Sequence, residues 1–240
     1  MNTCKNCNEP INGNYCSNCG QPTKVKRING NYVIHEIAHA FHAEQGISYT
    51  IKKLLISPGE EIKCYITENR SRLVKPIPFL IIVSLIYTVA LHFFHIGAED
   101  FSVQSDKIEL STVKIFFNWM LDHHGYVNII FGLFVAFWVK LFFRKSGYNL
   151  FEIFIVLCFL SGIMTLLSTV FVIFQGLTHQ HFILITSLIA RLYYVWAIGQ
   201  FFGKRKAINY IKAFLSCALG FYIFGFLLVT IGIFIDIAIK

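Results

Sequence analysis

Four cysteines near the start of the chain have the spacing of a metal site. They read Cys4-x2-Cys7-x8-Cys16-x2-Cys19. Each Cys-x-x-Cys pair can place two thiolates on one tetrahedral Zn²⁺, with Zn–S bonds of about 2.3 Å. Because protein sulfur would fill all four positions, we expect a closed structural zinc site with no place for a substrate. The segment has almost no apolar core, so the metal must supply its folding free energy.

Three other interpretations of these cysteines stay open: a pair of disulfides, a redox-active Cys-x-x-Cys, or a rubredoxin-like iron site. Disulfides are rare in a reducing compartment, which is where the topology derived below places this segment. The remaining cysteines, Cys64, Cys158 and Cys217, stand alone and are expected to be small apolar fillers.

A second metal-binding pattern is His35-Glu36-x-x-His39, with His42 close behind. On a helix both histidines share one face, and Glu36 could activate a zinc-bound water, as in a metalloprotease. The metzincin extension fails, because it requires histidine where the chain has Gln45. Two metal hypotheses stay open, a catalytic site with Glu36 and a non-catalytic site of His35, His39 and His42. We favour an interfacial helix with polar histidines.

Other histidines fall at the outer ends of the predicted membrane spans or in the outer loops. Imidazoles near carboxylates suit Zn²⁺ or a similar cation and respond to pH between about 5 and 8. The alternative is that an amphipathic side chain simply suits the membrane interface. These residues are His92, His95, His123, His124, His179 and His181.

Arg191 lies about nine residues, or roughly 14 Å, into the fourth predicted span. A charge at this depth is costly and is a functional candidate by default. Hydroxyls of the third span, such as Ser161 and Thr165, could accept its hydrogen bonds. We favour a structural contact or snorkelling towards headgroups, and a role in transport is the alternative.

The composition is that of an integral membrane protein. Of 240 residues, 55% are hydrophobic and 14% are charged, against about 25% charged in ordinary soluble domains. Residues 1–22 are predicted to form the ribbon, 23–75 a basic linker with amphipathic helices, and 76–240 the membrane domain. A span takes roughly 20 apolar residues, which predicts five, at 76–96, 127–143, 150–174, 182–202 and 213–239. The predicted fold is therefore an all-α membrane protein with about five transmembrane helices.

The juxtamembrane region is expected to hold short helices near 32–44, 49–56 and 58–70, with apolar faces on the inner membrane surface. Ser57-Pro58-Gly59-Glu60 has the pattern of a capping box that opens the third of them. A further amphipathic helix is expected near 108–121 in the first outer loop.

Lysine and arginine near the spans set the orientation. The second and fourth loops are basic, whereas the first loop has only Lys107 and Lys114 among five acids. This alternation predicts a multi-pass protein of the bacterial inner membrane, with its N-terminus in the cytosol and its C-terminus outside. The first 20 residues lack the apolar core of a signal peptide. Anionic lipid headgroups are the expected partners of the basic face, and the net charge of +8 does not argue for nucleic acid.

The stretch from residue 4 to about 80 resembles a bacterial family of uncharacterised membrane proteins, catalogued as a domain of unknown function. The resemblance implies a zinc ribbon on a multi-span membrane domain, and it implies no reaction. This chain has Glu68-Asn69-Arg70 where many members have Gly-Lys-Arg. The matching residues are Cys19-Gly20-Gln21, Thr50, Lys52, Leu54, Leu55, Pro58-Gly59, Tyr65-Ile66, Arg70 and Pro76-Ile77-Pro78-Phe79-Leu80.

From these features we expect a non-enzymatic membrane protein that acts as a scaffold, sensor or interaction protein. Its ribbon would bind a protein partner or another part of the chain. One alternative is a transporter or channel for a small solute or cation that uses Arg191 and the outer histidines. Another is a membrane-associated zinc metalloprotease with Glu36 as its catalytic residue. We found no phosphate-binding loop, serine nucleophile motif or dinucleotide fingerprint.

Overall fold

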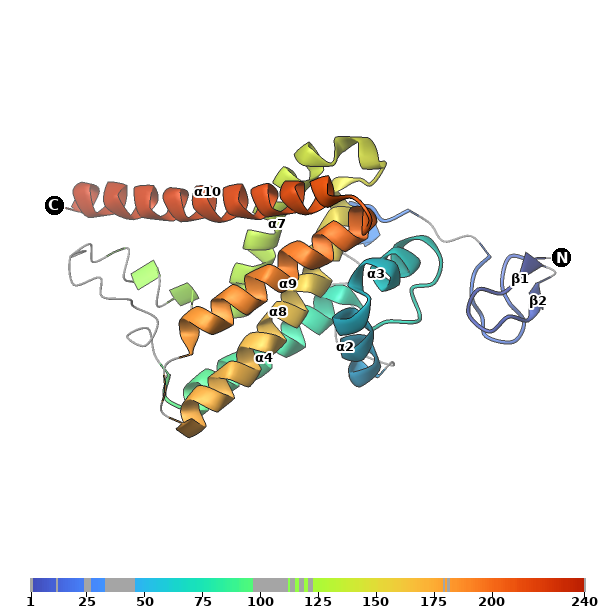
Figure 1. Ribbon diagram of the computed structural model, residues 1–240, viewed down its shortest axis with the longest axis horizontal. Coiled ribbons are helices and arrows are strands. Elements are labelled where there is room, and N and C mark those ends of the chain that lie inside the picture. Colours follow the sequence, from blue (N-terminus) through green and yellow to red (C-terminus); the bar gives the residue numbers. More distant parts are fainter. Residues whose placement is uncertain are drawn as a thin grey trace.

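The computed structural model describes residues 2–11, 13–23, 27–32, 46–96, 112, 115–116, 119–120, 123–178, 180 and 182–239. The N-terminal ribbon contains two short strands, β1 (Asn2–Thr3) and β2 (Pro10–Ile11). Two short helices follow, α2 (Ile47–Ile56) and α3 (Pro58–Thr67), which we call the collar. The helical bundle then contains α4 (Pro76–Phe93), α7 (His124–Phe142), the short 3-10 helix η1 (Arg144–Ser146), α8 (Leu150–Thr178), α9 (Ile183–Gly203) and α10 (Ala207–Ile239) (Figure 1).

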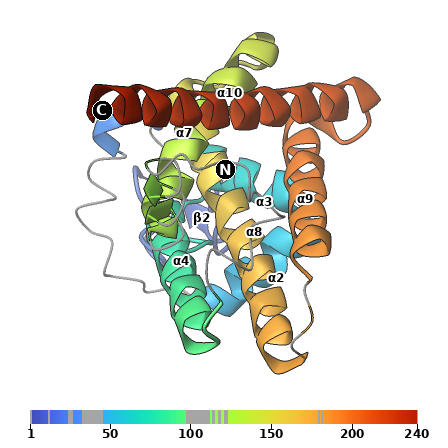
Figure 2. The same cartoon turned by 90° about the vertical axis from the view of Figure 1, so that its left-hand side faces the viewer.

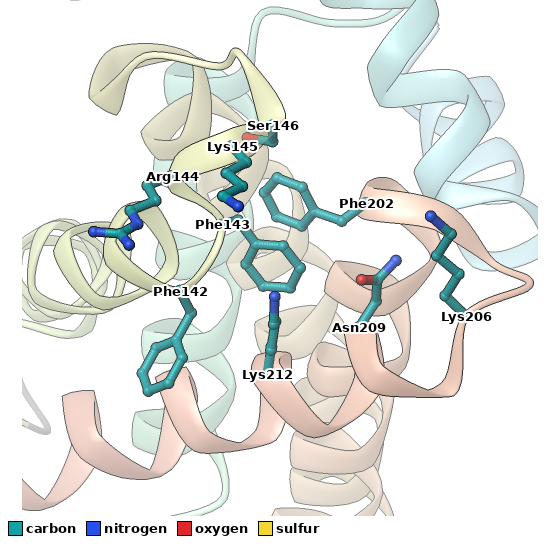
Figure 3. A pocket seen from close by; sticks show the side chains of 9 residues that line it. All are labelled: Phe142, Phe143, Arg144, Lys145, Ser146, Phe202, Lys206, Asn209 and Lys212. Atoms are coloured by element: carbon teal, nitrogen blue, oxygen red, sulfur yellow. The ribbon is translucent and has the colours of Figure 1, made fainter.

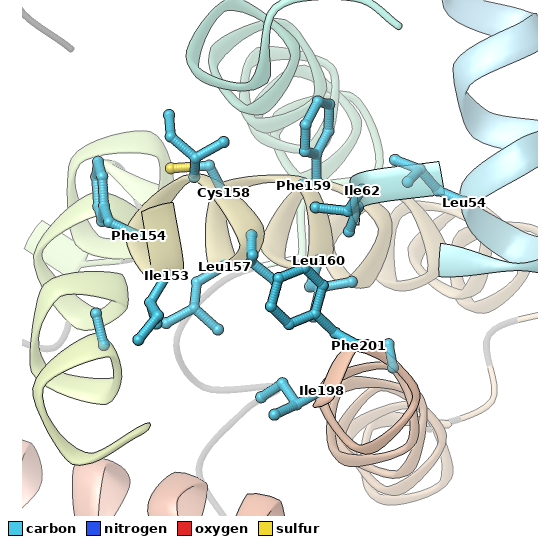
Figure 4. Packing of buried hydrophobic residues seen from close by; sticks show 14 of the residues in the cluster. Leu54, Ile62, Ile153, Phe154, Leu157, Cys158, Phe159, Leu160, Ile198 and Phe201 are labelled. Carbon is cyan, nitrogen blue, oxygen red and sulfur yellow. The ribbon is translucent and has the colours of Figure 1, made fainter. Parts of the chain in front are cut away.

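Helix α8 is the centre of the molecule, with α4, α7, α9 and the collar packed around it (Figures 1 and 2). Its first half is apolar on every side, which is typical of a helix that is buried all round. All side chains at 153–160 are buried, and Phe159 meets the edge of Tyr65 with ring centroids 5.1 Å apart. Ile198 and Phe201 of α9 join the same buried cluster (Figure 4). The core therefore unites the collar with the membrane helices.

Helices α4, α7, α8 and α9 alternate in direction along the bundle (Figures 1 and 2). Helices α4 and α8 run parallel, because Phe79 lies against Gly162 and Phe94 lies against Gly176. The starts of α4 and α8 therefore share one end of the bundle, where α7 and α9 end and α10 begins (Figure 1). We call this the collar end, because α2 and α3 pack there.

Four helices, α4, α7, α8 and α10, are long and apolar enough to cross a membrane. The predicted all-α membrane fold is thus confirmed. Helix α9 has 21 residues and coincides with the fourth predicted span. Polar and aromatic residues, including Arg191 and Gln200, make it less apolar than the other four. That α9 also crosses the bilayer stays a prediction.

Helix α10 lies across the collar end of the bundle and continues well beyond it (Figures 1 and 2). Its 33 residues correspond to a length of about 50 Å. Only 11% of the residues in its most apolar 18-residue stretch are buried, against 72% for the corresponding stretch of α8. The helix begins earlier than the predicted span, because Asn209 donates side-chain and main-chain hydrogen bonds to the carbonyls of Gly203 and Lys206, which close its first turn.

The collar packs on protein, whereas the sequence analysis assigned its apolar faces to lipid. Leu54 and Ile62 are fully buried in the core cluster of the bundle. Gly59 lets the start of α3 approach α9 closely: a Cβ at this position would lie 2.6 Å from the backbone carbon of Gln200. An amphipathic pattern specifies an apolar neighbour but does not say whether that neighbour is lipid or another helix.

The predicted capping box at the start of α3 is wrong. Pro58 does occupy the first turn, but the side chain of Ser57 makes no capping hydrogen bond. Glu60 instead accepts a hydrogen bond from the Lys204 ammonium, 2.6 Å away, at the end of α9. The ion pair lowers the pKa of the Glu60 carboxyl. The helices expected near 32–44 and 108–121 lie mostly outside the described residues.

Candidate metal centre

The first Cys-x-x-Cys pair lies on a turn that two backbone hydrogen bonds close. The amide of Cys4 donates to the carbonyl of Glu9 at 2.8 Å, and the amide of Asn8 donates to the carbonyl of Cys4 at 2.9 Å. Asn8 has a left-handed backbone with φ 62°, a conformation that asparagine tolerates better than most residues. The antiparallel pairing of β1 with β2 holds the two sides of this turn together.

The second pair repeats this geometry twelve residues later. The amide of Cys16 donates to the carbonyl of Gln21 at 2.8 Å, and the amide of Gly20 donates to the carbonyl of Cys16 at 2.9 Å. Gly20, with φ 71°, takes the place of Asn8. The sequence signal for this repeat is CKNCNE followed by CSNCGQ, and the sequence analysis used only the cysteines in it.

The two turns face each other and bring all four thiols together. Their sulfur atoms lie within 4.8 Å of one another. Cys4 Sγ is 3.5 Å from Cys19 Sγ, and Cys7 Sγ is 3.5 Å from Cys16 Sγ. Four sulfurs at about 2.3 Å from one tetrahedral ion would be about 3.8 Å apart. All four cysteines are free thiols, so the arrangement fits a single metal ion and does not fit a pair of disulfides.

Local hydrogen bonds favour the thiolate form at Cys19. A backbone hydrogen bond from Gln21 is the largest influence on this thiol, and the Asn6 side chain and neighbouring thiols act in the same direction. Together they outweigh burial and lower the pKa of Cys19 to about 6. The thiolate is the metal-binding form of cysteine, so this turn prepares one ligand before the metal arrives.

Cys7 shows the opposite balance. A backbone hydrogen bond from Glu9 lowers the pKa of its thiol, but burial and hydrogen bonds with the three other thiols outweigh it and raise the pKa to about 11. Clustered thiols cannot all ionise without a cation among them. Metal binding by the tetrad would therefore release protons.

A hydrogen-bond chain joins the tetrad to the turn between α3 and α4. The Asn6 side chain donates towards Cys19 and accepts from the Asn69 amide at 2.8 Å. Asn69 is 1% exposed, and its side-chain oxygen Oδ1 accepts hydrogen bonds from the backbone N–H and the hydroxyl of Ser71. Groups behind the first shell of a metal site orient its ligands. Asn6 and Asn69 lie 63 residues apart, so no local sequence pattern predicted that they meet.

Further contacts dock the ribbon on the same turn. The Lys5 ammonium lies 3.0 Å from the Glu68 carboxylate. The side-chain amide of Gln21 donates through Nε2 to the backbone carbonyl of Glu68 at 3.1 Å and accepts at Oε1 from the Ser71 hydroxyl at 3.3 Å. The second turn of the ribbon thus contacts the α3–α4 turn directly.

The linker after the ribbon is fixed to the start of α8. Arg27 donates to both carboxylate oxygens of Glu152, at 2.9 and 3.2 Å, and to the carbonyl of Gly147. Glu152 also forms a capping box with Asn149, since each backbone amide donates to the side chain of the other residue. Asn149 in turn donates to the carbonyl of Ile28 at 2.8 Å. This buried carboxylate has a structural role at the collar end.

The second metal-binding pattern cannot be placed. His35, Glu36, His39 and His42 lie outside the described residues, so a catalytic or non-catalytic site there stays a prediction. His179 and His181 are also outside them.

The other four outer histidines can be described, and they do not converge. His92 bonds the carbonyl of Thr88, and His123 stacks on Trp119 with ring centroids 4.8 Å apart. His124 meets the edge of Tyr87. Among the described residues, the cysteine tetrad is the one group of three or more potential metal ligands.

Arg191 does not bond the hydroxyls of α8 that the sequence analysis considered. It is exposed on α9, and its guanidinium lies over the ring of Phe221 of α10, 4.9 Å from the centroid. Ser161 lies 3.4 Å from the Tyr194 hydroxyl, and Thr165 accepts from Asn128 at 3.0 Å. This placement supports a structural contact between α9 and α10.

Comparison with known proteins adds a family of unknown function. No curated protein and no solved structure matches the chain. The family model described as "Protein of unknown function (DUF3667)" matches residues 44–88. The match covers α2, α3, the turn that docks the ribbon and most of α4. Over this stretch the chain is similar to that family, in keeping with the resemblance inferred from its sequence.

Proposed function

We propose that this is a non-enzymatic membrane protein in which a structural zinc ribbon has a scaffold, sensor or interaction role. The observation that carries the proposal is the cysteine tetrad, whose four sulfurs lie within 4.8 Å of one another. A metal held by four protein thiolates has no open position for a substrate, which is characteristic of structural sites. Iron in the same tetrad is the alternative that metal analysis would separate.

The contacts of the ribbon suggest what the metal does. The hydrogen bonds from Cys19 through Asn6 to Asn69 link the tetrad to the turn that leads into α4. We infer that metal binding organises the ribbon and thereby holds it on this turn. Loss of the metal would release the ribbon from the collar and expose both surfaces to other partners.

Metal analysis of the purified full chain tests the site. We expect one zinc per chain, no zinc in the Cys4→Ser, Cys7→Ser double variant, and unchanged zinc in Cys64→Ser, which removes a thiol outside the tetrad. Iron as the bound metal would overturn the zinc assignment. Zinc retained by the double variant would point to the site at His35, His39 and His42.

A pair of matched variants tests the coupling. Asn6 and Asn18 occupy the same position in the two repeats, but Asn6 reaches Asn69. Loss of a group behind the ligands typically weakens metal binding by about 10–100-fold, so we expect that loss for Asn6→Ala and a much smaller one for Asn18→Ala. Equal affinities in competition with a zinc chelator would contradict the coupling.

We propose that the collar end faces the cytosol of a bacterial inner membrane. The ribbon, the collar and the basic residues 144–145 and 204–206 all belong to this end, which fits the rule that cytoplasmic loops are rich in lysine and arginine. A protease added to spheroplasts, in which the outer membrane is opened and the inner membrane is intact, is expected to spare a tag placed before residue 1. Cleavage of that tag without lysis would reverse the orientation.

A further inference from the structure

A pocket of about 450 Å³ opens at the collar end, between the end of α7, the helix η1 and the start of α10 (Figure 3). Pockets that hold small ligands fall between about 300 and 1,000 Å³. The pocket does not overlap the cysteine tetrad or its docking turn. It is therefore a separate feature of the molecule.

Four cationic side chains line this pocket, namely Arg144, Lys145, Lys206 and Lys212, and no acidic residue does. Every ion pair that we find within the described part of the chain uses other cations, such as Lys204 with Glu60. Arg144 and Lys145 lie on η1, whereas Lys206 precedes α10 and Lys212 lies in its second turn, so the four cations come from two distant parts of the sequence. Their positive charge is thus concentrated without a protein counter-charge.

Aromatic rings form the wall between these cations. Phe143 and Phe202 stack with centroids 3.8 Å apart and planes 12° from parallel. The Lys212 ammonium lies 5.7 Å from the Phe143 centroid (Figure 3). The stack fixes the end of α7 against the end of α9. It therefore forms an apolar wall of the pocket beside the charged side chains.

Polar groups in the pocket are also available for an anion. The Ser146 hydroxyl is buried and has no hydrogen-bond partner within the described chain. Helix α10 starts at Ala207 beside the pocket, and the positive end of a helix dipole favours an anion there.

We propose that this pocket binds a phosphate group, and that the natural source is the headgroup of an anionic phospholipid. Four unpaired cations favour a headgroup with two or more negative charges, such as that of cardiolipin. Phe142 also lines the pocket and adds an apolar surface beside the cations. The sequence alone predicted that anionic headgroups are attracted to the whole basic face. In this proposal the residues that line the pocket bind them.

The test uses full-length protein and counts retained lipid by native mass spectrometry. Cardiolipin is titrated against phosphatidylglycerol at matched charge. The pocket variant is Arg144→Gln, Lys206→Gln, and the control is Lys52→Gln, Lys75→Gln, which removes the same charge near the collar. Each cation contributes a factor of about five near an anionic surface, so we expect the pocket variant to bind cardiolipin about 25-fold more weakly and the control to be nearly unchanged. Arg144→Lys, Lys206→Arg should restore binding.

A second arm titrates inorganic phosphate and pyrophosphate into lipid-free protein in detergent. Saturable binding that is lost in the pocket variant, without cardiolipin retention, would support the phosphate pocket and assign it to a soluble ligand. Equal loss of cardiolipin in the pocket and control variants, at equal thermal stability, would overturn the proposal. So would a failure of both lipid and phosphate to distinguish the two variants.

Discussion

The ribbon and helix α8 are each stabilised in a different way. Residues 153–160 of α8 are buried on all sides by apolar neighbours, and such burial stabilises each large side chain by about 1.5–3 kcal/mol. The ribbon has no comparable core: Tyr15 is exposed, and its buried residues include Cys4 and Cys16 themselves. One region is thus stabilised by many small packing contacts. The other, in the proposed function, depends on one metal ion held by the tetrad and on the turn where the ribbon docks.

The largest expected effect follows from removing the ion. Structural zinc supplies about 10–16 kcal/mol to small cysteine modules, so the Cys4→Ser, Cys7→Ser variant should unfold the ribbon completely. The bundle should keep its helical circular dichroism and its unfolding temperature. Limited proteolysis read by mass spectrometry would separate the two regions. If the bundle melted together with the ribbon, the two would form one cooperative unit and the comparison would fail.

A substitution at Gly59 should have the reverse effect. A Cβ at Gly59 would lie 2.6 Å from the Gln200 backbone carbon, which cannot move cheaply, so we expect Gly59→Ala to destabilise the collar and bundle by about 1–3 kcal/mol. The ribbon should retain its metal. Gly225→Ala is the matched control, because a Cβ at this position meets nothing within 4 Å. Replacing a helical glycine with alanine there should stabilise the helix by up to about 1 kcal/mol. Thermal unfolding in detergent would compare them, and equal melting temperatures would refute the close approach.

Asn69 tests the joint between the two regions. It is 1% exposed and bonds both Asn6 and Ser71, so Asn69→Ala leaves buried polar groups unpaired, at about 1–3 kcal/mol. We expect faster proteolytic cleavage between ribbon and collar with little change in bundle melting. Thr67→Ala, which removes an exposed hydroxyl bonded only to the carbonyl of Lys63, should not change the cleavage rate. Identical rates for both variants would mean that docking does not depend on Asn69.

The smallest expected effect is a pH dependence at the collar. Lys204 lowers the pKa of Glu60 below its ordinary value of 4.5. The pair therefore stabilises the fold above that ordinary pKa, and its contribution is lost as the pH falls through the lowered folded value. We expect Lys204→Gln to reduce the loss of thermal stability between about pH 5 and 3 slightly, and only at low salt, because exposed pairs are screened. If the melting temperature depended on pH in the same way in both proteins at low salt, this ion pair would not contribute to the pH dependence.

The parts of the molecule that sequence predicted well are those with local signals. The apolar runs identify α4, α7, α8 and α10 without any knowledge of their neighbours, and a Cys-x-x-Cys pair fixes both its ligands within one turn. The repeat CKNCNE and CSNCGQ was also available in the sequence and would have marked Asn6 as part of the site.

The parts that sequence missed depend on distant partners. Glu60 was assigned to a helix cap three residues away, but its partner Lys204 is 144 residues distant. The basic pocket likewise needs residues near 145 and near 206 to meet. The packing of α7 against α9 and α10 brings them together. The local sequence around a charged residue does not show which distant residue it meets, because many charged residues have similar local sequences.

The length of α10 has a consequence for the membrane itself. The apolar part of α10, residues 213–239, is about 40 Å long and exceeds the hydrocarbon thickness of about 30 Å by some 10 Å. This hydrophobic mismatch is relieved if the helix tilts strongly or the surrounding lipid thickens, each at a fraction of a kcal/mol per Å. Because α10 begins beside the basic pocket, its inclination would vary with bilayer thickness and would change the geometry of that pocket from one lipid environment to another.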